Sequence, residues 1–134
     1  IKLQTFVYEN FKIDNGVAYL IVKNKNIKNI LKDQQDCEFS CGEFINSILN
    51  IEGVKIAIII SQMEKNNYKV SFRCKKQYDV NVIAATIGGG GHKQASGAKF
   101  TGNAVEVMQQ LIDLGKKQIK ELDCVWKKWN CGVK

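Results

Sequence analysis

The segment Gly88-Gly89-Gly90-Gly91-His92-Lys93-Gln94-Ala95-Ser96-Gly97 decides how this chain is understood, because four consecutive glycines need a reason in a folded domain. Glycine loses more backbone entropy on folding than any other residue. Without side chains a loop can bend sharply, and its N–H groups can converge on a phosphate oxygen. A histidine and a serine add hydrogen-bonding groups, and Lys93 adds positive charge. The segment therefore predicts a phosphate-binding loop made by Gly88, Gly89, Gly90, Gly91, His92 and Ser96.

Two common phosphate-binding motifs do not fit this loop. A Walker loop ends in Gly-Lys followed by Ser or Thr, whereas here Gly91 is followed by His92 and Lys93 by Gln94. The dinucleotide-binding fingerprint follows a strand and opens a long helix, whereas this loop follows a short helical pattern. Taken by itself, the glycine run is also compatible with a flexible turn.

The sequence before the loop alternates strand-like and helical patterns. Thr5–Ile13 and Val17–Val22 are β-type runs around Asn15-Gly16, which is a favoured pair for a tight hairpin turn. A short polar helix is expected near residues 26–32. Ser40-Cys41-Gly42-Glu43 matches a capping box, so a second helix is expected through Leu49. Val54–Ser61 is almost entirely apolar, as in a strand that is buried on both faces.

The remaining elements surround the loop. Tyr68–Lys75 alternates cleanly and predicts a strand with Ser71 and Arg73 on its polar face. We expect a short helix from Asp79 to Ile87, a strand over Gly97–Phe100 and a long amphipathic helix with an apolar face reaching Leu122. From Cys124 onward, including Trp126 and Trp129, no period is evident. These elements predict an α/β (α+β) fold with a mixed central sheet, flanking helices and an N-terminal β-hairpin.

Composition narrows the function classes. The 134 residues suit a single domain (1–134), with a core of about residues 5–122 and a tail at 123–134. No apolar run is long enough to span a bilayer, so no membrane partner is expected. Five cysteines without a CxxC pair favour reduced thiols and a cytoplasmic location. One histidine argues against a metal site. The net charge of +7 favours polyanions, although a solubilising lysine surface explains it equally well.

Arg73 is the only arginine in a chain that otherwise uses lysine for positive charge. A guanidinium presents a planar fork of donors and can hold a phosphate in two places, which a lysine cannot imitate. We therefore add Arg73 to the predicted site, with Ser71 on the same strand face as a weaker candidate. The alternative is a surface ion pair between Arg73 and an aspartate.

The residues around the loop resemble a known family. Asp79-Val80-Asn81-Val82-Ile83-Ala84, followed by the glycine segment, is similar to the GGGH…A(S/A)G signature of the C-terminal domain associated with DHH-type phosphoesterases. Val70–Lys75 resembles the V-S-x-R-S-K strand of that family. The resemblance covers roughly residues 17–122 and is greatest to the nanoRNase/pAp phosphatase branch.

The resemblance implies a division of labour. In such proteins the DHH domain binds manganese and activates water, and the associated domain grips the terminal phosphate and base of the substrate. None of the metal-binding aspartate motifs of the DHH domain occurs here, so we expect this chain to hydrolyse nothing by itself and to bind no cofactor. The expected partners are a nucleotide or short oligonucleotide and the DHH domain of the full-length protein, a hydrolase of short oligoribonucleotides or pAp.

Other readings stay open at this point. The parent protein is alternatively a cyclic di-AMP phosphodiesterase, to whose associated domain the same signature belongs. A different class is a non-catalytic module that binds tRNA, as in the related glycine-rich domain that ends alanyl-tRNA synthetases. In that case the basic long helix should matter more than Arg73 and His92. A second copy of the chain, forming a homodimer, is a further candidate partner.

Overall fold

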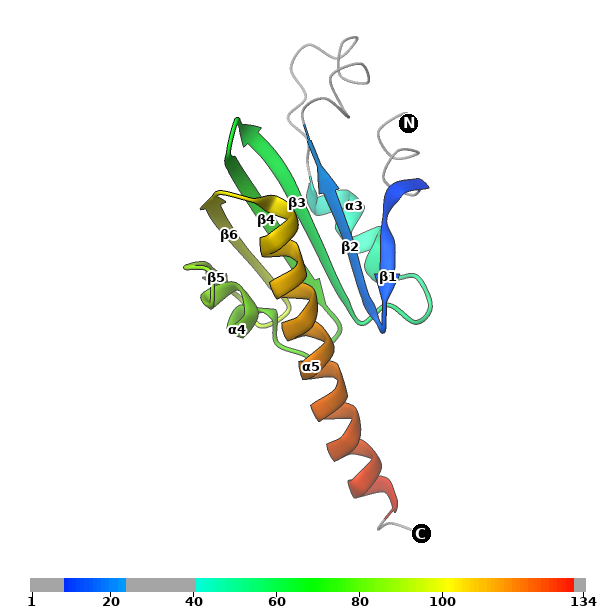
Figure 1. Cartoon of the computed structure of the whole chain (residues 1–134). Coiled ribbons are helices and arrows are strands. Elements are labelled where there is room, and N and C mark those ends of the chain that lie inside the picture. Colours follow the sequence, from blue (N-terminus) through cyan, green and yellow to red (C-terminus); the bar gives the residue numbers. More distant parts are fainter. Residues whose placement is uncertain (1–8, 24–40, 132–134) are drawn as a thin grey trace.

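The computed structural model describes residues 9–23 and 41–131 (Figure 1). The first two strands, β1 (Lys12–Asp14) and β2 (Val17–Val22), form the expected hairpin. Asn15 and Gly16 both have positive φ, 48° and 91°, which is the reason that Asn-Gly is favoured in such turns. Within the described residues the first strand begins at Lys12. Residues 5–8 of the predicted strand, the helix expected near 26–32 and Ser40 lie outside the described residues.

The other elements are α3 (Cys41–Leu49), β3 (Ile56–Glu64), β4 (Asn67–Cys74), α4 (Val80–Ala85), β5 (Gly90–Gly91), β6 (Ala95–Thr101) and α5 (Ala104–Cys131). The six strands of the described ranges form one mixed sheet in the order β1-β2-β3-β4-β6-β5. Among these strands β2 and β3 pair in parallel, and the other neighbouring pairs are antiparallel. The mixed sheet and flanking helices confirm the predicted fold class.

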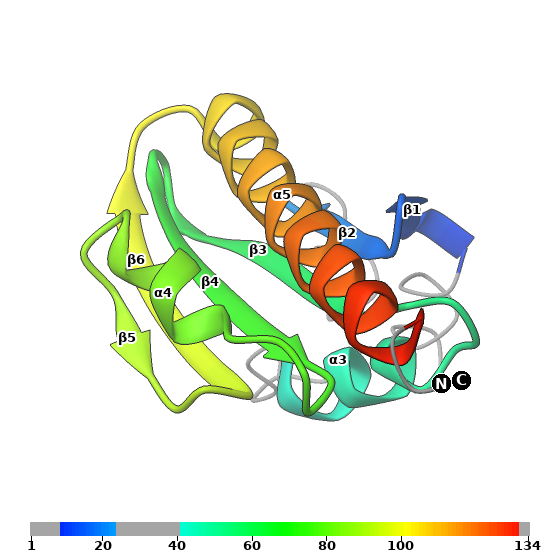
Figure 2. The ribbon, with the colours of Figure 1, turned by 90° about the horizontal axis from the view of Figure 1, so that it is seen from below.

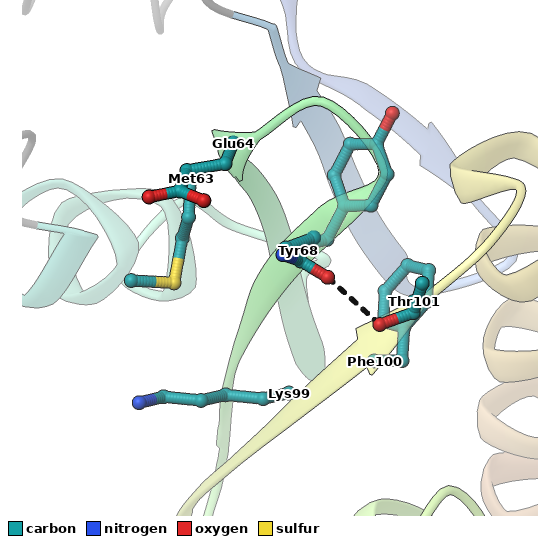
Figure 3. Close-up of a pocket in the computed structure, with 7 residues that line it drawn as sticks. Met63, Glu64, Tyr68, Lys99, Phe100 and Thr101 are labelled. Atoms are coloured by element: carbon teal, nitrogen blue, oxygen red, sulfur yellow. Dashed lines mark hydrogen bonds between the residues drawn. The ribbon is translucent and has the colours of Figure 1, made fainter.

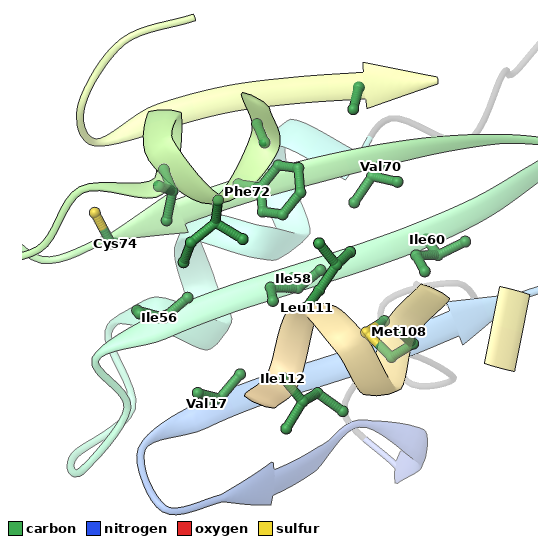
Figure 4. Close-up of a cluster of buried hydrophobic side chains, with 14 of the residues drawn as sticks. Val17, Ile56, Ile58, Ile60, Val70, Phe72, Cys74, Met108, Leu111 and Ile112 are labelled. Carbon is green, nitrogen blue, oxygen red and sulfur yellow. The ribbon is translucent and has the colours of Figure 1, made fainter. Parts of the chain in front are cut away.

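The helices cover the sheet unequally (Figure 2). On one face α4 and α5 bury a cluster to which β3 contributes Ile56, Ile58 and Ile60. Figure 4 shows these side chains directed toward Met108 and Leu111 of α5. On the other face α3 packs over a smaller cluster that includes Ala57 and Ile59. The central strand β3 is therefore buried on both faces, as its apolar sequence predicts.

The long helix extends further than the sequence indicated. No period was evident from Cys124 onward, but α5 continues to Cys131 and projects beyond the sheet (Figure 1). Leu122, Val125, Trp126 and Trp129 recur at helical spacing, and no proline interrupts them. They are exposed rather than part of the core, and they line a hollow of about 460 Å³ with Tyr78 and Lys55. Leu122 had been expected on the core face.

Polar contacts anchor α5 to the rest of the fold. Lys55 Nζ donates to Asp123 Oδ2 at 2.7 Å, and the Tyr78 hydroxyl donates to Asp123 Oδ1 at 3.1 Å. These contacts raise the pKa of Lys55, while Lys55 holds the pKa of Asp123 below its usual range.

Among the described residues, no helix is both long and apolar enough to cross a membrane.

The Lys55–Asp123 pair gives a prediction about pH. The pKa of Asp123 is lowered in the folded state. The ionised carboxylate therefore adds to the free energy of unfolding above the ordinary aspartate pKa, and this stabilisation is lost as the pH falls through the lowered value. Both side chains are more than a third exposed, so Asp123→Asn should cost less than about 1 kcal/mol at neutral pH. Urea unfolding at neutral pH and well below the ordinary pKa of about 3.9 measures the difference, which should vanish in acid. Asp113→Asn, an exposed change on the same helix, is the control. An equal loss at both pH values would contradict this role.

Candidate functional site

The glycine loop connects a capped helix to the edge of the sheet. The carboxylate of Asp79 accepts hydrogen bonds from the backbone N–H groups of Asn81 and Val82 and so begins α4, as expected from its position. The first two glycines close the helix, since Gly88 N donates to Ala85 O and Gly89 N donates to Ala84 O. Gly90 and Gly91 then form β5, a two-residue edge strand that the sequence did not predict.

Gly89 lies where no other residue fits. A Cβ atom built on it would come within 2.4 Å of both the Gly97 carbonyl oxygen and the Ala98 Cβ of β6. The backbone of the loop therefore rests directly on the strand that follows it. This contact sets the distance between the end of α4 and the sheet. It also explains why one of the four loop positions must be glycine.

The loop does not present the ring of free N–H groups that the glycine run suggested. The N–H groups of Gly88 and Gly89 close α4, Gly91 N donates to Asn81 Oδ1 at 3.0 Å, and His92 N donates to Ala95 O at 2.8 Å. These four N–H groups therefore do not converge on a ligand as a nest, because each already donates to an acceptor within the fold. Phosphate binding by the glycines stays a prediction, and it now rests on the space that they leave.

The exit of the loop is a tight turn from His92 to Ala95. Besides the backbone bond from His92 N to Ala95 O, the Ser96 hydroxyl donates to His92 O at 2.6 Å. Ser96 is buried, and its side chain braces the turn from within. The His92 side chain is exposed. The turn thus presents the imidazole to solvent, whereas the Ser96 hydroxyl already serves the fold.

The turn packs against the end of β4. Cys74 N donates to Gln94 O, the Cys74 thiol donates to Lys93 O at 3.3 Å, and Val80 N also donates to Lys93 O. Burial raises the pKa of the Cys74 thiol, which fits a structural sulfur rather than a reactive one. These bonds fix the turn at the edge where β4 ends and α4 begins.

Arg73 lies at the same end of the sheet as this turn. It pairs in register with Ala95 of β6 and is partly exposed. Its Nη1 donates to the neighbouring Phe72 carbonyl oxygen at 2.8 Å, which uses one of its five N–H donors. Within residues 9–23 and 41–131 no carboxylate forms an ion pair with Arg73, so the surface ion pair considered for it is not seen there.

The predicted site residues divide between two faces of the sheet. Side chains alternate along a strand, and Phe72 belongs to the core under α4 and α5, so Arg73 and Ser71 point to the α3 face. Ser96 pairs with Phe72 and shares its face, which separates Ser96 from Arg73. Ser71 is only 9% exposed. Arg73 and the turn that carries His92 are therefore the predicted groups that lie at one end of the sheet and stay accessible.

Sequence reasoning missed the residues that hold the loop in place. Asn81 accepts from Gly91 N, and Gln118 of α5 makes two bonds to Asp79: its Oε1 accepts from Asp79 N at 2.7 Å, and its Nε2 donates to Asp79 O at 2.8 Å. A continuous chain of contacts thus links α5, the cap of α4 and β5. The sequence predicted the helix cap at Asp79. It did not predict that Gln118 binds Asp79 or that Gly91 donates to Asn81.

A metal centre does not fit the described part of the chain. Across residues 9–23 and 41–131, no three His, Cys, Asp or Glu side chains gather in a way that could hold a metal ion.

Comparison with known proteins identifies the family. The model of the DHHA1 domain matches residues 17–121, which is most of the chain and includes the loop, β4 and nearly all of the core. The chain belongs to the DHHA1 domain family. The matched range contains the glycine loop together with β4 and α4, which precede it in the chain.

Two relatives that are similar in sequence are both named NrnA. A probable bifunctional oligoribonuclease and PAP phosphatase NrnA of Streptococcus mutans is 36% identical over 118 residues, which cover 86% of this chain and 36% of that protein. The bifunctional oligoribonuclease and PAP phosphatase NrnA of Mycoplasma pneumoniae is 33% identical over 98 residues, 73% of this chain and 28% of that protein. The chain spans about a third of the length of these relatives.

A solved structure shows the same fold. An exopolyphosphatase-related protein from Bacteroides fragilis superposes with a TM-score of 0.76 at 25% identity, over 89% of this chain and 35% of that one. A pGpG-specific phosphodiesterase from Vibrio superposes with a TM-score of 0.52 at 12% identity, which shows the fold alone. In each case the match covers only a part of the larger protein.

The close approach at Gly89 predicts a steric cost. Gly89→Ala should lower the free energy of unfolding by about 1–3 kcal/mol, because the methyl group overlaps β6 and the backbone must shift. Gly97→Ala is the matched control, since its Cβ would lie at an ordinary 3.4 Å from Val70 O. Urea unfolding of the two variants measures the difference. Equal stability of the two variants would contradict the close-packing argument.

The Asn81–Gly91 bond predicts a local effect. Asn81→Ala should remove the acceptor for Gly91 N and speed hydrogen exchange of that amide, with a loss of stability near the lower end of about 0.5–1.5 kcal/mol. NMR-detected exchange gives the rate for each amide. Asn103→Ala, which removes the cap of α5 at Val105 and Glu106, should leave the Gly91 amide unchanged. Unaltered exchange at Gly91 in Asn81→Ala would show that this bond does not hold the loop.

Proposed function

We propose that this domain binds the phosphate and base of a short oligoribonucleotide or of pAp for a DHH-family phosphoesterase. The observation that carries the proposal is Arg73, whose partly exposed guanidinium has no carboxylate partner in the described ranges and lies beside the turn of His92. A planar fork with unused donors suits a phosphate. Ser71 is a further candidate on the same face.

The names of the relatives support this substrate class. Two NrnA proteins that share at least 33% identity with the chain are called oligoribonucleases and PAP phosphatases. Because the chain covers about a third of each, hydrolysis is proposed for the full-length protein and assigned to its DHH domain, with manganese bound there. The role proposed for this chain is to hold the substrate while that domain acts.

The contribution of Arg73 is measurable. Arg73→Lys keeps the charge but loses the fork, so it should weaken binding of pAp and of 5′-phosphorylated dinucleotides by about 1–3 kcal/mol. NMR titration of the 134-residue chain suits the millimolar to micromolar affinity that we expect of half a cleft. In the parent chain, shifts should concentrate at Arg73 and residues 88–96.

Two comparisons make this test specific. Lys117→Arg, an equally charge-conserving change on the exposed side of α5, should leave the affinity unchanged. Cyclic di-AMP, titrated in parallel, distinguishes a cyclic dinucleotide phosphodiesterase from the proposed class. If Arg73→Lys binds pAp and the dinucleotides as tightly as the parent chain, the clamp role of Arg73 is wrong.

A further inference from the structure

Two lysines face each other across the strands next to the glycine loop. Lys69 of β4 and Lys99 of β6 are direct partners in the register, and both are exposed. Side chains at directly opposite positions have Cβ atoms about 4.5–5.5 Å apart, and like charges there destabilise a sheet. A nearby negative charge would therefore stabilise a pair of this kind.

The described residues provide no such charge by direct contact. The ion pairs found there join Lys55 to Asp123 and Lys116 to Asp14, and neither involves Lys69 or Lys99. Glu64 lines a hollow of about 380 Å³ together with Lys99 but forms no ion pair with it. Figure 3 shows the Lys99 side chain extending away from Phe100 and Thr101, and so away from the core face of β6.

A second hollow joins the two lysines to the glycine loop. It has a volume of about 420 Å³ and is lined by Lys69, Gly88, Gly89, Gly97, Ala98 and Lys99. The glycines leave the space unfilled, and the lysines supply positive charge at its border. Strand β5 pairs only as far as Gly97, so β6 from Ala98 onward is an open edge among the described strands. An anionic ligand thus has access from the side.

The lysine pair belongs to the same face as Arg73. Lys69 and Arg73 are four residues apart on β4, so both point to the same side of the sheet. At a rise of about 3.4 Å per residue their Cα atoms lie roughly 14 Å apart. This separation suits two different phosphate groups along one extended ligand better than two contacts to a single phosphate.

We propose that Lys69 and Lys99 bind a second phosphate group of the ligand whose other phosphate Arg73 holds. The inference rests on the proposed function and adds a length preference to it. An oligonucleotide with phosphates beyond the terminal one reaches both places, whereas a nucleoside monophosphate reaches one. The lysine pair then distinguishes a chain of nucleotides from a single nucleotide. The bound phosphate of such a chain neutralises the repulsion between the two lysines.

The test compares one ligand that has a single phosphate with one that has several. Affinities of AMP and of the trinucleotide pApApA are measured for the parent chain and for the double variant Lys69→Gln/Lys99→Gln. The variant should lose roughly tenfold in affinity for pApApA and little for AMP. The slope of log affinity against log salt for pApApA should become shallower by about 0.7, since each phosphate neutralised on a single strand contributes about 0.7.

A matched variant controls for net charge. Lys117→Gln/Lys120→Gln removes the same two positive charges from exposed positions of α5, which covers the opposite face of the sheet. It should bind both ligands as the parent does. An equal loss in this control would overturn the inference in favour of nonspecific attraction to a basic chain or a binding surface on the helix.

The remaining outcomes separate the inference from the proposed function. If Lys69→Gln/Lys99→Gln keeps the full preference for pApApA while Arg73→Lys weakens both ligands, the second phosphate site is wrong and the proposed function stands. If the parent chain binds neither ligand, both are overturned. Loss of the length preference in the lysine variant alone supports the second site.

Discussion

The absence of a side chain at Gly89 is the constraint on which the loop depends. A single added carbon atom would lie 2.4 Å from the backbone of β6, so the end of α4 can rest on the sheet only because glycine occupies this position. That contact brings β5 to the edge of β6 and starts the turn that carries His92. This approach places the turn beside Arg73. Asn81, which accepts from Gly91 N, and Gln118, which is hydrogen-bonded to the backbone of Asp79, hold the loop there.

The loop and the sheet face serve different purposes. The backbone N–H groups of the loop donate hydrogen bonds within the fold, and the Ser96 hydroxyl stabilises the turn. The glycines therefore leave an open space and do not offer free donors to a ligand. Lys69 and Lys99 line that space, and Arg73 lies toward the other end of β4. The face that α4 and α5 cover stays apolar, and the opposite face beyond α3 carries the polar groups.

Local patterns were enough to predict much of this structure. Asn15-Gly16 indicated the hairpin, the apolar run from Val54 indicated the central strand, and the alternation from Tyr68 placed Arg73 on the polar face. The two-residue strand β5 and the partners of Asn81 could not be predicted, because they depend on segments that meet only in the folded chain. The end of α5 was missed for another reason: its apolar side chains keep the helical period but are not buried.

The projecting end of α5 also determines what optical measurements on this protein report. Both tryptophans of the chain, Trp126 and Trp129, lie on this segment and are 65% and 74% exposed. Their intrinsic fluorescence therefore senses solvent and neighbours at the tip of one helix, on the side of the sheet opposite Arg73. Occupation of the sheet face would leave little trace in that emission, whereas anything that covers the helix tip would shift it strongly.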